Sequence, residues 1–352
     1  MKIAYVAFED FNTESGVLKK VVKQMQYWIQ NGHDVRLLVV SSQLDVWTGI
    51  GNIQVSIFQP NDDKGLLNYF QSWHPDVVYV RVPFKARHMW HVTKNIPTFF
   101  EINSDDLIEF KMFHKPNWLQ SWKYKWVRKI IFERASGLVF VTNELASTHY
   151  GRGNDYRVIS NGVSLTDYQI QDVPKNLTPR LVFMGTKGFP WHGVEKIITM
   201  AQHFQTWHFD MIGYNEEDIE GVKPPNVHFH GVLPRYAYEP ILGKADVAIG
   251  TLSLYEKNMD EACPLKVREY LAYGLPVISG YHDSDFPNSI PFILQLPNIS
   301  TNVEDNLDKI EKFVLCWMGK RVERKDVVHI DVAMKEEERL EFFKKFLSGD
   351  AK

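Results

Sequence analysis

One predicted helix carries charged residues whose types and spacing suit a phosphate-bearing ligand. The helix is expected from Pro264 to Tyr273, because proline is favoured at a helix start and Gly274 can end it in the left-handed conformation. Unpaired backbone N–H groups and the helix dipole make such an N-terminus an anion site. Lys266 lies in the first turn, where a cation is unfavourable for the dipole unless it meets a bound anion.

Two glutamates flank this lysine. Glu269 lies one turn beyond Leu265 and could accept two hydrogen bonds from a ribose diol, and Glu261 lies in the preceding loop. A hydrolase would use such carboxylates about 5 to 9.5 Å apart across a scissile bond. Pro264 and Lys266 between them favour a phosphate-bearing donor instead. The structural alternative is that all three charges are simply solvated.

The segment from Glu261 to Ile278, with its closing Gly-Leu-Pro-Val-Ile, resembles the Glu-x7-Glu signature of retaining GT-B glycosyltransferases, particularly family 4 (glycosyl transferases group 1). The resemblance covers nearly the whole chain. It implies that Glu261 is a catalytic residue near the donor sugar and that Glu269 holds the ribose of a nucleotide. It also places Pro264 and Leu265 in the donor site.

A second segment, Gly185 to Val194, resembles the first strand–helix turn of that family's nucleotide domain. Many relatives carry arginine after the first glycine and lysine before the second, both directed at the diphosphate. Here these positions hold Thr186 and His192, and Lys187 is displaced by one position. We expect Gly185, Thr186 and His192 to line the donor site, with Lys187 and Lys266 neutralising the diphosphate, although lysine lacks the guanidinium fork.

The N-terminal half supplies three further elements of the resemblance. Ser15 and Gly16 match the glycine loop that approaches the phosphate or the acceptor, although Gly16 alone also fits a tight turn. Ser160 to Val163 resembles the Asn-Gly-Val element before the interdomain linker, a sequence that on its own indicates only a turn. Asn103 stands where relatives often carry histidine, so an acid–base function is lost there, while its amide can still hydrogen-bond a sugar hydroxyl. By the resemblance, Asn103 is a second candidate catalytic residue besides Glu261.

Apolar strands alternate with amphipathic helices along the chain, which predicts βαβ units and parallel sheets. We expect an α/β GT-B fold in which two Rossmann-like domains face a central cleft. Residues 1–170 would bind the acceptor and residues 175–332 the nucleotide sugar, joined by a polar linker at 171–179. Residues 333–352 would return to the N-terminal domain. Strands are predicted at 2–8, 34–40, 77–82, 98–102, 138–141, 157–159, 181–185, 208–212, 227–230, 247–249 and 276–279, and helices at 17–31, 194–204, 264–273 and 334–347.

Composition excludes several other classes. The net charge of −3 argues against a general nucleic-acid binder, and two cysteines without metal-ligand spacing fit a reducing compartment. The first residues are typical of a strand rather than a signal peptide, and no apolar run approaches 18 residues. We therefore expect a cytoplasmic enzyme that can associate peripherally with the inner face of the membrane. We expect no cofactor and no metal, because no Asp-x-Asp pair has a context suited to bridging a diphosphate.

Residues 111–135 form a strongly basic segment with seven basic residues and one acidic residue. Trp118, Trp122 and Trp126 recur within it at every fourth position, the spacing of one helix face. A basic helix with tryptophans can lie on an anionic membrane. The alternative, favoured by the usual behaviour of helical stripes, is that the tryptophans pack inward and the basic face is merely solvated.

The resemblance implies transfer, with retention, of a sugar from a UDP- or GDP-type nucleotide sugar to a hydroxyl of a glycan or lipid-linked acceptor. Bacterial surface polysaccharide or glycoconjugate synthesis is the expected setting. Two alternatives stay open. One is a GT-B-fold epimerase or phosphorylase, which the fold does not exclude. The other is a catalytically silent module that binds a sugar nucleotide, suggested by Thr186, His192 and Asn103.

Overall fold

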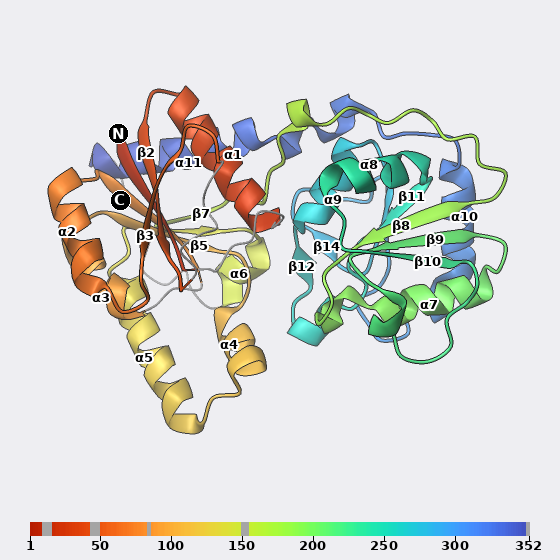
Figure 1. Cartoon of the computed structure of the whole chain (residues 1–352), viewed down its shortest axis with the longest axis horizontal. Coiled ribbons are helices and arrows are strands. Elements are labelled where there is room, and N and C mark those ends of the chain that lie inside the picture. The colour runs from red at the N-terminus through yellow and green to blue at the C-terminus, as the bar shows by residue number, and fades with distance from the viewer. Residues whose placement is uncertain (9–15, 43–49, 83–85, 149–154, 350–352) are drawn as a thin grey trace. The chain divides into compact units, whose positions relative to one another are not determined.

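The computed structural model describes residues 1–8, 16–42, 50–82, 86–148 and 155–349. The chain forms two compact units, and each is described by itself (Figure 1). Unit 1 comprises Met1–Ser160 and Val332–Lys352, and unit 2 comprises Asn161–Asp331. The first boundary lies earlier in the chain than the expected residue 170. The reason is that Leu165 packs in the core of unit 2 and the N–H of Val163 bonds to the carbonyl of Ile330.

Unit 1 is built on a seven-stranded parallel sheet with the strand order β3-β2-β1-β4-β5-β6-β7. Six of these strands confirm predicted ones, and the edge strand β3 was not predicted. Its sequence, Gln-Val-Ser-Ile-Phe, is only partly buried and alternates polar with apolar residues. The strands are β1 Lys2–Ala7, β2 Asp34–Val40, β3 Gln54–Phe58, β4 Val77–Arg81, β5 Thr98–Ile102, β6 Gly137–Phe140 and β7 Tyr156–Val158.

Helices pack on this sheet through the apolar positions that their sequences predict. Helix α1 buries Val21, Met25 and Trp28, and α11 packs beside it with Leu340 and Phe343 in the same core (Figure 1). The expected return of the C-terminal helix to the N-terminal domain is thus confirmed. The helices are α1 Gly16–Gln30, α2 Asp63–Trp73, α3 Ala86–Asn95, α4 Asp106–His114, α5 Trp118–Glu133, α6 Asn143–Thr148 and α11 Val332–Leu347.

Unit 2 contains a six-stranded parallel sheet in the order β10-β9-β8-β11-β13-β15 and a separate pair, β12 and β14. Its principal helices are α7 Val194–His203, α8 Arg235–Lys244, α9 Leu265–Ala272 and α10 Leu307–Trp317. The strands are β8 Arg180–Met184, β9 His208–Ile212, β10 Val227–Gly231, β11 Val247–Ile249, β12 Glu261–Ala262, β13 Val277–Ser279, β14 His282–Asp283 and β15 Ile293–Gln295.

Both large sheets reverse their strand order at a central pair, β1 and β4 in unit 1 and β8 and β11 in unit 2. Ligands of open parallel sheets bind beyond the carboxyl ends of the strands at such a reversal. In unit 1 these ends lead into 9–15 and 83–85, which lie outside the described residues together with the predicted Ser15. In unit 2 the loop after β8 is described, and it begins at Gly185.

Candidate functional site

The turn after β8 is closely packed and depends on glycine. A Cβ atom on Gly185 would lie 2.6 Å from Cε1 of Phe183 and 2.9 Å from Nδ1 of His192. Gly193, at the start of α7, has a φ of 67°, and a Cβ there would lie 2.6 Å from the Ser253 hydroxyl oxygen. The two glycines therefore let the loop from β8 to α7 lie against the neighbouring backbone and side chains.

His192 is buried in this turn and carries no positive charge near neutral pH. Burial, followed by the charge of Lys266, lowers the pKa of His192 to about 2. Its Nδ1 lies 3.0 Å from the Tyr214 hydroxyl, which donates its proton to the Thr186 carbonyl at 2.9 Å. Nδ1 must then carry the imidazole proton, which leaves Nε2 as an acceptor. His192 can accept a hydrogen bond from a ligand hydroxyl, but it cannot neutralise a phosphate.

Lys187, the other predicted phosphate ligand of this turn, is occupied at the surface. Its ammonium group lies 3.2 Å from a carboxylate oxygen of Asp218, and its side chain is 70% exposed. An exposed pair of this kind is worth little free energy. The lysine can therefore exchange Asp218 for another anion at low cost.

Lys266, in contrast to Lys187, has a buried ammonium group without a carboxylate partner among the described residues. Its Nζ atom is inaccessible to solvent and has no hydrogen-bond partner among the described residues, although the side chain as a whole is partly exposed. Nζ lies 4.1 Å from the centre of the Phe183 ring. Burial lowers the pKa of Lys266 to about 7. An ammonium group without partners favours an anionic ligand that restores its full charge.

Lys266 lies in the first turn of α9, which begins one residue later than predicted. Pro264 is extended and caps the helix, and its carbonyl accepts the N–H groups of Val267 and Arg268. Tyr270 joins the helix to the end of β8, because its hydroxyl oxygen accepts the Met184 N–H at 2.6 Å. The helix therefore places Leu265 and Lys266 at its N-terminus, where backbone N–H groups lack intrahelical partners.

Glu269 lies one turn further along α9 and is partly exposed. The Tyr238 hydroxyl donates to its Oε1 at 2.7 Å and fixes the orientation of the carboxylate. Burial and then the charge of Glu269 raise the pKa values of Tyr168, Tyr238 and Tyr273. The three phenols therefore remain protonated and can act as hydrogen-bond donors.

Glu261 lies on a strand, and its predicted position in a loop is wrong. Strand β12 pairs with β14, which brings Glu261 opposite His282. Cys263 follows two residues later and accepts two hydrogen bonds from Asn161. The backbone N–H of Asn161 donates to the Cys263 sulfur at 3.4 Å, and its side-chain amide donates to the Cys263 carbonyl at 2.9 Å. The Asn-Gly-Val element therefore contacts the chain between Glu261 and α9.

An ion cluster that was not predicted from the sequence fixes α9. Arg268 is fully buried, and its guanidinium group makes two hydrogen bonds of 2.7 Å to Asp283 and lies 2.8 Å from Asp285. It also donates to the carbonyl of Asn161 at 3.0 Å. Two features of the sequence could have predicted this cluster: an arginine between the buried positions Val267 and Tyr270, and the Asp-Ser-Asp sequence after a strand. Both carboxylates of that Asp-x-Asp pair contact the guanidinium group of Arg268.

Asn103, the candidate catalytic residue of unit 1, belongs to a second buried ion cluster. Its amide donates to Oε1 of Glu101 at 2.8 Å, and its oxygen accepts Lys20 at 3.3 Å. Burial alone would raise the pKa of Glu101, but Lys20, Arg339 and Arg81 hold that pKa well below its usual value. Both ends of the Asn103 amide are therefore engaged within unit 1. Gly16 is exposed at the first residue of α1.

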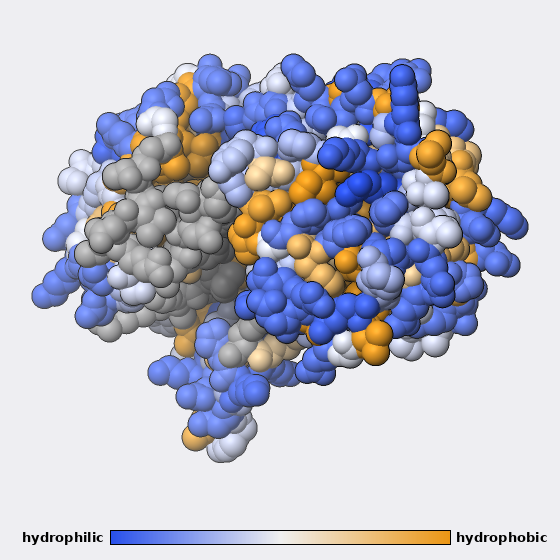
Figure 2. Space-filling model, turned by 45° about the vertical axis from the view of Figure 1, so that its right-hand side comes forward, coloured by the Kyte–Doolittle hydropathy of each residue, from blue (hydrophilic) through white to orange (hydrophobic). Residues whose placement is uncertain are grey.

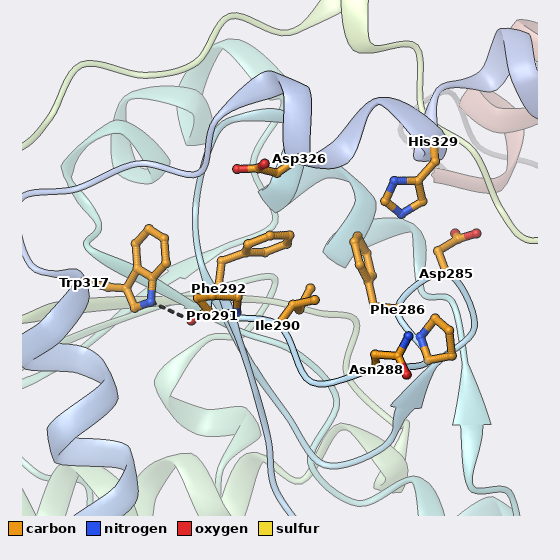
Figure 3. Close-up of a pocket in the computed structure, with 10 residues that line it drawn as sticks. Asp285, Phe286, Asn288, Ile290, Pro291, Phe292, Trp317, Asp326 and His329 are labelled. Carbon is orange, nitrogen blue, oxygen red and sulfur yellow. Dashed lines mark hydrogen bonds between the residues drawn. The ribbon is translucent and has the colours of Figure 1, made fainter.

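A pocket of about 480 Å³ lies elsewhere in unit 2 (Figure 3). Phe286 and Phe292 meet edge to face at 5.6 Å in its wall, and the Trp317 indole N–H donates to the Pro291 carbonyl at 2.9 Å. No predicted donor-site residue lines this pocket. Asp285, which also pairs with Arg268, is its link to the ion cluster of α9.

Comparisons with known proteins identify the fold. No family model and no curated protein matches the sequence. Solved structures match over nearly the whole chain: sucrose-phosphate synthase from Thermosynechococcus elongatus has a TM-score of 0.70 and 13% identity, covering 99% of this chain and 97% of that one. The lipopolysaccharide outer core galactosyltransferase WaaB, in its apo form, has a TM-score of 0.66 and 11% identity, covering 99% and 100%. Anabaena HepE, in complex with UDP and glucose, has a TM-score of 0.67 and 13% identity, covering 98% and 99%. The predicted GT-B fold is confirmed.

Proposed function

We propose that the protein is a retaining, family-4-type glycosyltransferase that transfers a sugar from a UDP- or GDP-type nucleotide sugar to a hydroxyl group. The observation that carries the proposal is the unpartnered ammonium group of Lys266 in the first turn of α9. A diphosphate is the anion that suits this place, because the neighbouring Glu269 can accept a ribose diol. Structural neighbours with the same fold include glycosyltransferases, and HepE binds UDP and glucose.

The proposed donor complex assigns one part of the ligand to each side chain. Lys266 and the N-terminus of α9 hold the diphosphate, Glu269 holds the ribose, and Glu261 holds hydroxyls of the donor sugar. His192, neutral and with Nε2 as an acceptor, takes a further sugar hydroxyl rather than a phosphate. Lys187 reaches the diphosphate only by leaving Asp218.

Charge stabilisation is the main catalytic demand on these residues. Negative charge grows on the departing diphosphate as the glycosidic bond breaks, and fixed donors directed at that charge lower the barrier. Lys266 supplies such a charge from within the chain, so we propose that transfer needs no metal. Unit 1, with Gly16 and Asn103, would bind the acceptor, a glycan or lipid-linked sugar of bacterial surface polysaccharide or glycoconjugate synthesis.

Calorimetric titration with UDP, GDP and ADP in the presence of EDTA tests the donor site. One nucleotide should bind saturably, and Glu269→Ala should weaken binding by about 1–3 kcal/mol, the worth of charged hydrogen bonds to a ribose. Glu323→Ala is the matched control, since Glu323 pairs with Lys325 at 2.6 Å at the surface of unit 2. Equal affinities for the Glu269 variant and the wild type would remove Glu269 from the site.

The silent sugar-nucleotide module is a second candidate, because His192 is neutral and Lys187 is paired with Asp218. It predicts nucleotide binding without turnover. Incubation with radiolabelled nucleotide sugars and a panel of glycan and lipid-linked acceptors separates the two, since only a transferase yields labelled product. Anomeric analysis of that product by NMR then tests retention.

A further inference from the structure

Helix α5 exposes an aromatic face to solvent. Trp118, Trp122 and Trp126 are 73%, 62% and 51% exposed, and Leu119 beside them is 53% exposed. The rings of Trp122 and Trp126 stack with centres 6.3 Å apart and planes 9° apart. The alternative in which this stripe packs inward is therefore wrong. Large exposed apolar faces of this kind mark interaction surfaces.

The orientation of the helix is fixed by its opposite face. The Arg128 guanidinium group binds both carboxylate oxygens of Asp106, at 2.7 and 2.8 Å, and the Tyr124 hydroxyl donates to the same carboxylate at 2.9 Å. Phe132 meets Phe100 edge to face at 5.3 Å. Because these contacts hold one face of α5 against unit 1, the tryptophans must point outward.

Positive charge surrounds the tryptophans. Lys123, Lys125 and Lys129 are exposed on the same helix, and Lys111 and Lys115 are exposed just before it. The segment 111–135 contains seven basic residues against Glu133 alone. In Figure 2 the lower end of unit 1, where Figure 1 places α5, is mainly hydrophilic, with an apolar spot at its tip.

We propose that this face of α5 docks the protein on an anionic phospholipid bilayer. Indole rings prefer the boundary between headgroups and acyl chains, while neighbouring lysines reach anionic headgroups. A second copy of the chain is the poorer occupant, because two equally basic faces repel each other. Among the described residues, no helix is long and apolar enough to cross a bilayer. In the proposed attachment, α5 lies in the plane of the interface.

Vesicle flotation tests the docking surface without nucleotide or acceptor, so its result is independent of the proposed function. The probes are vesicles of phosphatidylcholine alone and of phosphatidylcholine with phosphatidylglycerol. The wild type should float with the anionic vesicles only. Replacing Trp118, Trp122 and Trp126 by serine should reduce the partition coefficient about sixtyfold, at roughly fourfold for each of the three lost apolar contacts. Bromine-labelled lipid should quench the tryptophan fluorescence of the wild type but spare that of this variant.

A charge variant tests the second half of the surface. Replacing Lys123, Lys125 and Lys129 by glutamine should weaken binding by about fivefold for each lysine and reduce its salt dependence. Glutamines at the exposed Lys312, Lys320 and Lys325 of unit 2 give the same net charge, and Tyr236→Ser removes an aromatic ring that is 80% exposed there. Both control variants should float like the wild type.

Three results would overturn the proposal. The first is that the serine variant floats as well as the wild type. The second is that the wild type floats equally well with neutral and with anionic vesicles, while the charge variant floats with anionic vesicles as well as the wild type does. The third is that the wild type does not bind vesicles. Binding to duplex DNA, or sedimentation as a dimer that the serine substitutions dissociate, would then identify the partner of this surface. Circular dichroism and urea unfolding establish that the variants are folded, as expected for exposed positions.

Discussion

Burial of its ammonium group makes the charged form of Lys266 unfavourable in the folded chain. Its Nζ atom lies over the Phe183 ring and is removed from solvent, and burial lowers its pKa to about 7. Strongly shifted pKa values often mark functional groups. We expect the proposed diphosphate to recover, on binding, the free energy that this one residue costs the folded chain.

Nucleotide-sugar affinity should therefore depend on pH. Below pH 7 Lys266 is charged and affinity is highest. Above pH 7 a proton must be taken up on binding, so affinity falls by up to about tenfold per pH unit until the raised pKa of the complex is passed. Calorimetry with a nucleotide sugar between pH 6 and 9 measures this, since such a donor lacks the terminal phosphate proton that titrates near pH 6. Lys266→Met should bind weakly and with no such slope; a slope unchanged in this variant would assign it to another group.

The same variant should be more stable than the wild type in the absence of ligand. The pKa of Lys266 is lower in the folded than in the unfolded chain, so its cost to stability is complete below pH 7 and declines as the pH rises toward about 10. Lys266→Met should raise the free energy of unfolding by roughly 1–3 kcal/mol at pH 7 and by less at pH 9.5. Urea unfolding checks this, with Lys325→Met, an exposed position, as the control. A loss of stability at pH 7 would contradict the unpartnered state of the ammonium group.

At the scale of the element, most of the fold and part of the site follow from local sequence. Apolar runs give the central strands, and Pro264 and Gly274 delimit α9 to within one residue. The edge strand β3 escapes prediction because its polar residues face solvent, where packing does not select them. A spacing of four residues places Trp118, Trp122 and Trp126 on one helix face. Which face is buried depends on a contact with another helix, because Arg128 of α5 pairs with Asp106 of α4.

The same limit applies to the charged residues of the site. Sequence places Lys187 and Lys266 near one another by analogy, yet only the structure distinguishes the exposed pair with Asp218 from the solitary buried ammonium. Arg268 and Asp283 lie fifteen positions apart and belong to different elements. Their pairing depends on how α9 and β14 pack together, which no local pattern encodes.

Arg268 should be essential to the stability of unit 2. Arg268→Met leaves the carboxylates of Asp283 and Asp285 buried without their cation and removes a donor to the Asn161 carbonyl. Breaking a buried ion pair on one side costs about 3–5 kcal/mol. Urea unfolding should show this loss, whereas Lys325→Met, at an exposed pair with Glu323, should lose far less. Comparable losses for both variants would mean that the buried cluster contributes no more than a surface pair.

At the scale of the whole molecule, the chain leaves unit 1 at Ser160 and returns to it at Val332. Unit 2 is thus a continuous segment, whereas unit 1 is completed only by the last helix. In α11, Glu336 accepts the Trp28 indole N–H at 3.0 Å, and Arg339 lies 3.6 Å from Glu101. Ending the chain at Asp331 removes these groups and the apolar side chains of α11 from unit 1.

Such a truncation should unfold unit 1 while sparing unit 2. Loss of the buried Leu340, Phe342 and Phe343 alone costs about 5–9 kcal/mol, which is comparable to the total stability of a domain. In differential scanning calorimetry, the truncated chain should lose one unfolding transition, and the remaining one should still shift upward in temperature with the nucleotide that the full chain binds. A chain ending at Leu347, which keeps all of α11, should retain both transitions. If the chain ending at Asp331 also keeps both, α11 is dispensable to unit 1; if no nucleotide shifts the remaining transition, the donor site is not contained in unit 2.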